Sequence, residues 1–122
     1  MEQIDALRRR YLARLEPLRS AIEARRGAYA AAGCGDDAAL EKIRLNIVNI
    51  FATLATAAGG GDRGAYCRAC LERFETVPAN WRQRLADAQR HGDAATAAVE
   101  TVKLETAAVL TAIFREEMEA AQ

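Results

Sequence analysis

The stretch AALEKIRL, residues 38–45, recurs 59 residues later as AAVETVKL, residues 97–104, with four of the eight positions identical. The comparison extends in both directions without a gap. From the pair Ala6 and Ala65 to the pair Leu54 and Ile113, 11 of 49 residue pairs are identical. Self-similarity at a fixed spacing indicates a duplicated supersecondary unit, although two unrelated Ala-rich hairpins in the same phase could match nearly as well; both interpretations predict two helical hairpins of matched length.

Each copy has the hydrophobic pattern of two helices joined by a short break. Apolar residues recur at intervals of three and four, which places them along one face of a helix. The break is GCGDD at 33–37 in the first copy and HGD at 91–93 in the second. Glycine is common just beyond the end of a helix. The pattern predicts two helical hairpins, at about 3–58 and 65–119, with GGGDRG at 59–64 as their linker.

These hairpins predict an all-α fold, an up-down-up-down four-helix bundle that forms a single helical domain over residues 1–122. A proline lies in the first helix of each hairpin, at Pro17 and Pro78. Because proline removes a backbone donor and clashes with the preceding turn, we expect a kink or break at each. The third helix is expected to split at Pro78, with Thr76 capping the new start.

The predicted core collects the apolar stripes of the four helices, and its largest side chain is that of Trp81. We expect Trp81 to anchor the packing between the two hairpins, because aromatic residues are few. The full set is Leu7, Tyr11, Leu15, Leu18, Ile22, Leu40, Ile43, Ile47, Phe51, Leu54, Tyr66, Phe74, Val77, Trp81, Val99, Val102, Val109, Ile113 and Phe114.

Charge is balanced over the whole chain but alternates along it. The 17 basic and 17 acidic residues give no net charge, so no nucleic-acid partner is expected. Net charge is +3 for residues 1–33, −1 for 34–61, +2 for 62–92 and −4 for 93–122. Each basic helix is therefore expected to have acidic neighbours in the bundle. No apolar run approaches the roughly 20 residues that span a bilayer, so no membrane association is expected.

The start of the chain, MEQIDALRRRYLARLEPL, is charged throughout and does not resemble a signal or transit peptide. A cytoplasmic location is expected on this ground. Alanine is abundant and arginine greatly outnumbers lysine. That composition favours a bacterial origin.

The stretch AYCRACLERF contains a C-x-x-C pattern, Cys67 and Cys70. At a helix N-terminus such a pair can have a lowered thiol pKa, so a thiol redox sensor or oxidoreductase is one functional hypothesis. In the repeat, however, Cys70 takes the core position of Tyr11, and Cys67 takes that of Arg8 beside it. We therefore expect Cys70 to be buried as a small apolar residue and Cys67 to lie near the edge.

A zinc site is the second chemistry to consider, because Cys34, Cys67, Cys70 and His91 would make a complete ligand set. The bundle topology places Cys34 and His91 at one end and the other two cysteines at the opposite end. The helical chain between Cys67 and His91 spans roughly 36 Å. No metal site is expected, and with no E-x-x-H pair or phosphate-binding loop, no cofactor or enzymatic activity is expected either.

The second helix of each hairpin carries a leucine opposite its apolar stripe. Leu45 has Ala52 close by and Val48 on its flank, and its repeat equivalent Leu104 lies near Ala108. A helix that is apolar on two sides is either central in its fold or meets a partner. These five residues predict an interface. The functional hypothesis is a non-enzymatic protein-interaction module, a small bacterial adaptor or chaperone-like protein that binds a partner or forms a homodimer.

Overall fold

The computed structural model describes residues 2–120, which form five α-helices and no strand. The helices are α1 (Glu2–Ala31), α2 (Gly35–Ala57), α3 (Arg63–Thr76), α4 (Ala79–His91) and α5 (Ala94–Ala120). The predicted all-α four-helix bundle is confirmed, with α3 and α4 as the two parts of its third helix. The ends of the predicted domain, Met1, Ala121 and Gln122, lie outside the described residues.

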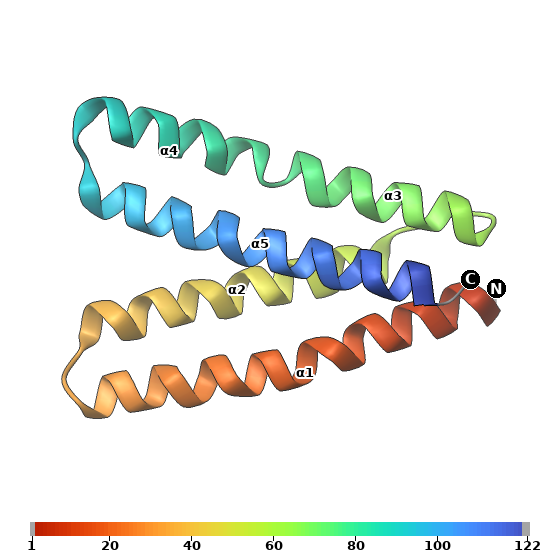
Figure 1. The fold of residues 1–122 in the computed structure, drawn as a ribbon, viewed down its shortest axis with the longest axis horizontal. Helices are drawn as coiled ribbons and strands as arrows, with labels where there is room; N and C mark the ends of the chain where they lie inside the picture. The colour runs from red at the N-terminus through yellow and green to blue at the C-terminus, as the bar shows by residue number, and fades with distance from the viewer. Residues whose placement is uncertain (1, 121–122) are drawn as a thin grey trace.

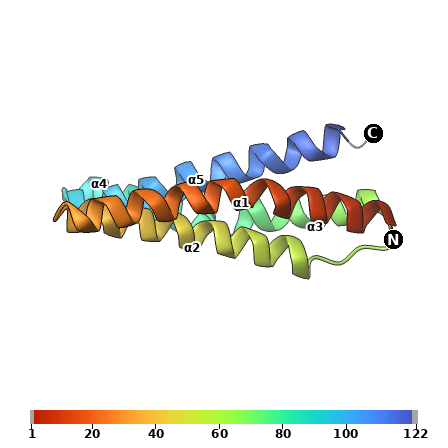
Figure 2. The same ribbon diagram turned by 90° about the horizontal axis from the view of Figure 1, so that it is seen from below.

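The two hairpins lie side by side, with α2 and α5 in the middle (Figure 1). The α1–α2 and α4–α5 turns are at one end of the molecule, and the α2–α3 connection is at the other (Figure 1). α3 contacts α1, α2 and α5, whereas within the described residues α4 contacts only α5 and α3. The bundle is therefore thick around α3 and becomes thin toward the two turns (Figure 2).

Both hairpin turns have the same backbone conformation. Gly33 and Gly92, which are repeat equivalents, have φ values of 77° and 68°, in the left-handed region that glycine adopts without steric cost. The residue after each glycine donates its N–H to the carbonyl oxygen five positions earlier, at 2.8 Å in the first turn and 2.9 Å in the second. This is the Schellman ending of a helix, present in both copies.

The repeat also extends to burial. The buried residues of α2 are Glu41, Ile47, Val48, Phe51 and Ala55. Their equivalents 59 positions later, Glu100, Thr106, Ala107, Leu110 and Phe114, are all buried in α5, which adds only Val102. The same positions of both copies therefore face the interior.

An aromatic cluster around Phe74 of α3 forms the centre of the core. Its ring stacks on Phe51 at 4.6 Å between centroids and meets the edge of Phe114 at 5.3 Å. Two buried tyrosines cross between the hairpins. Tyr11 donates its hydroxyl to the carbonyl of Leu110 at 3.1 Å, and Tyr66 donates to that of Ala55 at 2.6 Å.

The prediction that Trp81 anchors the hairpins to each other is not confirmed, because Trp81 packs against the core cluster from its rim and is not one of its buried members. Trp81 is half-buried on α4, with the Lys103 ammonium of α5 over its ring at 5.7 Å. Both residues of this contact belong to the second hairpin, and within the described residues α4 lies against α5 and α3 only. Phe74 and the two crossing tyrosines join the hairpins instead.

Val109 is also wrongly predicted as a core residue. Its side chain is 50% exposed, and the neighbouring Leu110 is fully buried in its place. Leu40, Ile43 and Val99 are only half-buried, because they lie near the turns where the bundle is thin. On α2 and α5, the face that points into the core includes Glu41 and Glu100. It is therefore rotated about the helix axis from the apolar stripe that the sequence predicts.

The prolines differ in effect. α1 runs unbroken through Pro17. Pro17 has no N–H to donate to the carbonyl of Ala13, four residues earlier. Both residues lie on the exposed face of the helix. At Pro78 the helix does break, as predicted. The predicted Thr76 cap is wrong, because its hydroxyl donates back to the carbonyl of Arg73 at 3.5 Å and the N-cap of α4 is Pro78.

Ion pairs join α1 to its acidic neighbours. Arg10 and Arg14 approach Glu117 of α5 at 3.1 and 3.2 Å, and Arg25 approaches Glu41 of α2 at 2.6 Å. Among the described helices, none combines the length and the apolar character required to cross a membrane.

Candidate functional site

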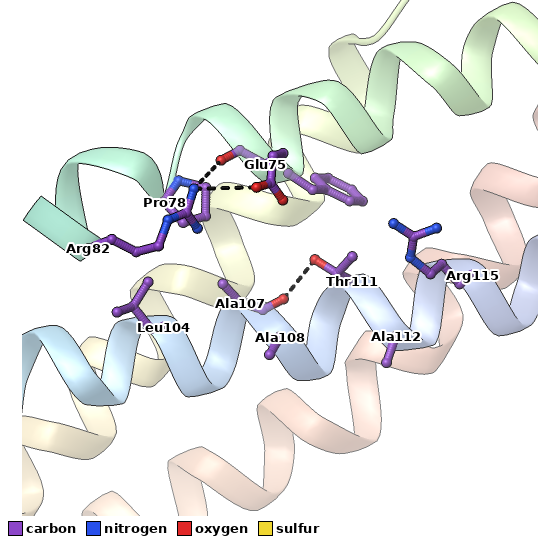
Figure 3. Close-up of a pocket in the computed structure, with 10 residues that line it drawn as sticks. Glu75, Pro78, Arg82, Leu104, Ala107, Ala108, Thr111, Ala112 and Arg115 are labelled. Atoms are coloured by element: carbon purple, nitrogen blue, oxygen red, sulfur yellow. Dashed lines mark hydrogen bonds and ion pairs between the residues drawn. The ribbon is translucent and has the colours of Figure 1, made fainter.

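A groove runs between α5 and the junction of α3 and α4 (Figure 3). We call it the α5 groove. It encloses about 340 Å³. One wall is formed by Phe74, Glu75, Pro78 and Arg82, and the other by Leu104, Ala107, Ala108, Thr111, Ala112 and Arg115.

The helix break at Pro78 shapes one wall of this groove. α3 ends in a normal turn, with the N–H of Val77 bonded to the carbonyl of Arg73 at 3.0 Å. The guanidinium of Arg82 then reaches back across the break to Glu75, at 3.1 Å to its carbonyl and 3.5 Å to its carboxylate (Figure 3). The charged pair at this wall is therefore already satisfied, and the surface between it and α5 is largely apolar.

A second groove of about 390 Å³ lies between α1 and α2. Its walls are Leu12, Glu16, Ala52, Thr53, Thr56 and Ala57. Four of these six residues are repeat equivalents of residues in the α5 groove, since Glu16, Ala52, Thr53 and Thr56 correspond to Glu75, Thr111, Ala112 and Arg115. Each hairpin therefore has a hollow at the same place, and the two differ in their side chains.

The predicted interface residues are divided between the two hairpins. Leu104 and Ala108 line the α5 groove, and Ala52 lines the groove of the first hairpin. Leu45 is half-buried and packs against the core, so it does not face directly away from it. Val48 is fully buried in the core and belongs to no exposed surface. The five residues therefore do not form one continuous patch.

The two thiols of the C-x-x-C pattern are both buried, which corrects the expectation that Cys67 lies near the edge. Its repeat equivalent Arg8 is half-buried on α1, so these two equivalent positions differ in burial. Burial raises the pKa of Cys67, against the lowering effect of Arg63 and Arg68. Burial also raises the pKa of Cys70 to about 11. Both groups are therefore protonated thiols at neutral pH.

The cysteines and the histidine do not converge. Cys34 and His91 are exposed near the two hairpin turns, and Cys67 and Cys70 lie in α3, toward the other end (Figure 1). Among residues 2–120 no group of three or more potential ligand side chains could hold a metal ion.

Two buried carboxylates were missed in the sequence, Glu41 and Glu100. Glu41 pairs with Arg25 and Arg44, and Glu100 pairs with Lys103 at 3.0 Å. One signal could have found them. Glu is identical in both copies of the repeated stretch and is followed three residues later by a basic residue in each.

No protein-family model, curated protein or solved structure matches this chain.

Proposed function

We propose that this chain is a non-enzymatic interaction module, a small cytoplasmic adaptor or chaperone-like protein of a bacterium, that receives an amphipathic helix in the α5 groove. The observation that carries this proposal is the groove itself, whose floor is apolar and whose one ion pair is already satisfied. An apolar hollow of this kind suits the side chains on one face of a helix.

The position of Leu104 supports the same proposal. Leu45, its repeat equivalent, packs against the core cluster, whereas Leu104 lies at the wall of the groove and outside that cluster. Ala108 and Ala112 follow it on the same helix, and their small side chains would let a second helix approach closely.

The thiol hypothesis draws less support from the same molecule. Thiolate chemistry needs an accessible sulfur with a lowered pKa. Cys67 and Cys70 are both buried, and burial raises the pKa of each.

A photo-crosslinking residue placed at Ala108 tests the interaction module in cells. We expect a discrete protein adduct there, and we expect Leu104→Glu in the same chain to abolish it. The matched control carries the crosslinker at Ala24, which is exposed on α1 and lines neither groove. Adducts that are equal at Ala108 and Ala24, or that survive Leu104→Glu, would contradict the proposal.

A further inference from the structure

We propose that the occupant of the α5 groove is α5 of a second copy of this chain, docked antiparallel across a two-fold axis. This inference rests on the proposed function and names its partner. It begins from the outer face of α5, which consists of Thr101, Glu105, Ala108, Ala112, Arg115 and Glu119. These residues alternate at intervals of four and three, the spacing with which two helices pack along a common seam.

This face is open to a partner. The C-terminal half of α5 lies at the edge of the molecule, where no other helix covers its outer side (Figure 2). On one flank Leu104 lines the α5 groove, and on the other Val109 is half exposed. Val109 is the most exposed large hydrophobic side chain among the described residues. The exposed apolar surface that a partner would bury therefore lies on the two flanks of the seam.

The register follows from the small residues at the centre of the seam. In an antiparallel pair, Ala108 can lie opposite Ala112 of the second copy, and the same contact recurs across the two-fold axis. Two alanines in contact allow helix axes to approach to about 8 Å. This register brings Val109 near Val109 of the second copy, where each would cover the other.

Charge complementarity selects this arrangement. The register that pairs the alanines also places Glu105 opposite Arg115 of the second copy, twice in the dimer. Both side chains are exposed, and within the described residues neither has an ion-pair partner. A parallel arrangement would instead place Glu105 opposite Glu105 and Arg115 opposite Arg115, and like charges in contact disfavour it.

The repeat explains why α5 and not α2 is the docking helix. The equivalents of Glu105, Ala108, Ala112 and Arg115 on α2 are Asn46, Asn49, Thr53 and Thr56. At these four positions the outer face of α2 therefore has no acidic residue, no basic residue and no pair of alanines. The same positions are buried in both copies, but only α5 carries this set of charges and alanines on its outer face.

A charge-swap experiment on the full chain tests the proposal by sedimentation equilibrium and native mass spectrometry. We expect the wild-type chain to dimerise. Glu105→Arg and Arg115→Glu should each raise the dimer dissociation constant about tenfold or more, because each variant sets like charges together in both pairs. An equimolar mixture of the two variants should form a heterodimer, since both pairs are then again of opposite charge.

The matched controls are Asn46→Arg and Thr56→Glu, which make the same residues at the equivalent positions of α2 and should leave dimerisation unchanged. Circular dichroism verifies folding, and the neutral variants Glu105→Gln and Arg115→Gln repeat the test with smaller changes. A wild-type chain that is monomeric at every concentration overturns the self-docking proposal. A dimer that both single reversals leave intact, or single variants that do not form a heterodimer, would also overturn it. A monomer that still gives the Ala108 adduct with another protein rejects self-docking and retains the interaction module.

Discussion

Glu41 of α2 and Glu100 of α5 are repeat equivalents and both are buried, but their carboxylates are paired differently. Glu41 lies between Arg44 of its own helix and Arg25 of α1, whose Nε is 2.6 Å from its Oε1. Glu100 pairs through Oε2 with Lys103, and its Oε1 has no hydrogen-bond partner in the described part of the chain. The equivalent of Arg25 is Arg84, on the separate helix α4.

Neutralising the two carboxylates should therefore have unequal effects. Glu41→Gln removes the negative charge between two arginines and replaces one of its two acceptor oxygens with an NH2 group, and we expect the free energy of unfolding to fall by about 2 to 3 kcal/mol. Glu100→Gln removes a buried charge that is only half paired, and we expect a change of less than about 1 kcal/mol. Urea unfolding of both variants, followed by circular dichroism, measures the difference. Equal losses would show that the pairing with Arg25 contributes nothing.

The two crossing tyrosines should also differ in their contributions. The carbonyl of Leu110 lies in the middle of α5, where the helix supplies a donor of its own. The carbonyl of Ala55 lies in the last turn of α2, where helical donors have run out, and it accepts from Tyr66 and from Arg8 Nε at 3.2 Å. We expect Tyr66→Phe to cost about 1.5 kcal/mol and Tyr11→Phe about 0.5 kcal/mol in unfolding free energy.

Thermal and urea unfolding of the two phenylalanine variants measure this difference, since each change removes only a hydroxyl from a fully buried ring. An Arg8→Lys variant in the Tyr66→Phe background provides the control, because it weakens the remaining donor at the same helix end. If Tyr11→Phe proves the more costly change, the helix-end argument is incorrect.

Features that depend on local signals were predictable from the sequence. The repeat, the four helical segments, both glycine turns and the break at Pro78 each follow from residues close together in the chain. Gly33 and Gly92 are examples, because a left-handed helix ending requires only the local backbone. The structure confirms these features because the tertiary packing favours the same backbone conformations as the local sequence.

Features that depend on tertiary position were not predictable. Val109 and Leu110 are adjacent apolar residues that both fit the stripe, and only the packing of α5 decides which is buried. Glu41 is absent from the predicted core because a carboxylate is costly to bury, and Arg25 on another helix offsets that cost. Cys67 lies on α3, which contacts all four other helices, and its own sequence neighbours do not show that it is buried.

Alanine substitution of three glycines should separate backbone strain from helix propensity. Gly33→Ala and Gly92→Ala place a side chain at positive φ, and we expect each to lower the unfolding free energy by about 1 kcal/mol. Gly27 lies inside α1, with open space around the position of a Cβ atom. Gly27→Ala should therefore raise stability by about 0.5 to 1 kcal/mol. Three changes of the same sign in thermal unfolding would contradict this account of the turns.

The buried thiols predict that stability falls in alkaline solution. Burial raises the pKa of Cys70 to about 11 from an ordinary value near 9, so the unfolded chain loses this proton first. The native state then binds more protons than the unfolded state, and the free energy of unfolding decreases as pH rises from about 9 to 11. Burial also raises the pKa of Tyr11 and Tyr66 well above the usual range, which extends the decline beyond pH 10.

Urea midpoints between pH 7 and 10 measure this decline, and Cys70→Ala should reduce its slope near pH 9, where the tyrosines do not yet titrate. Alkylation at pH 8 gives an independent check. Cys34 is exposed and should react rapidly with iodoacetamide, whereas Cys67 and Cys70 should react only through opening of the native state. Cys67 modified as rapidly as Cys34 would contradict its burial and would favour the redox hypothesis over the interaction module.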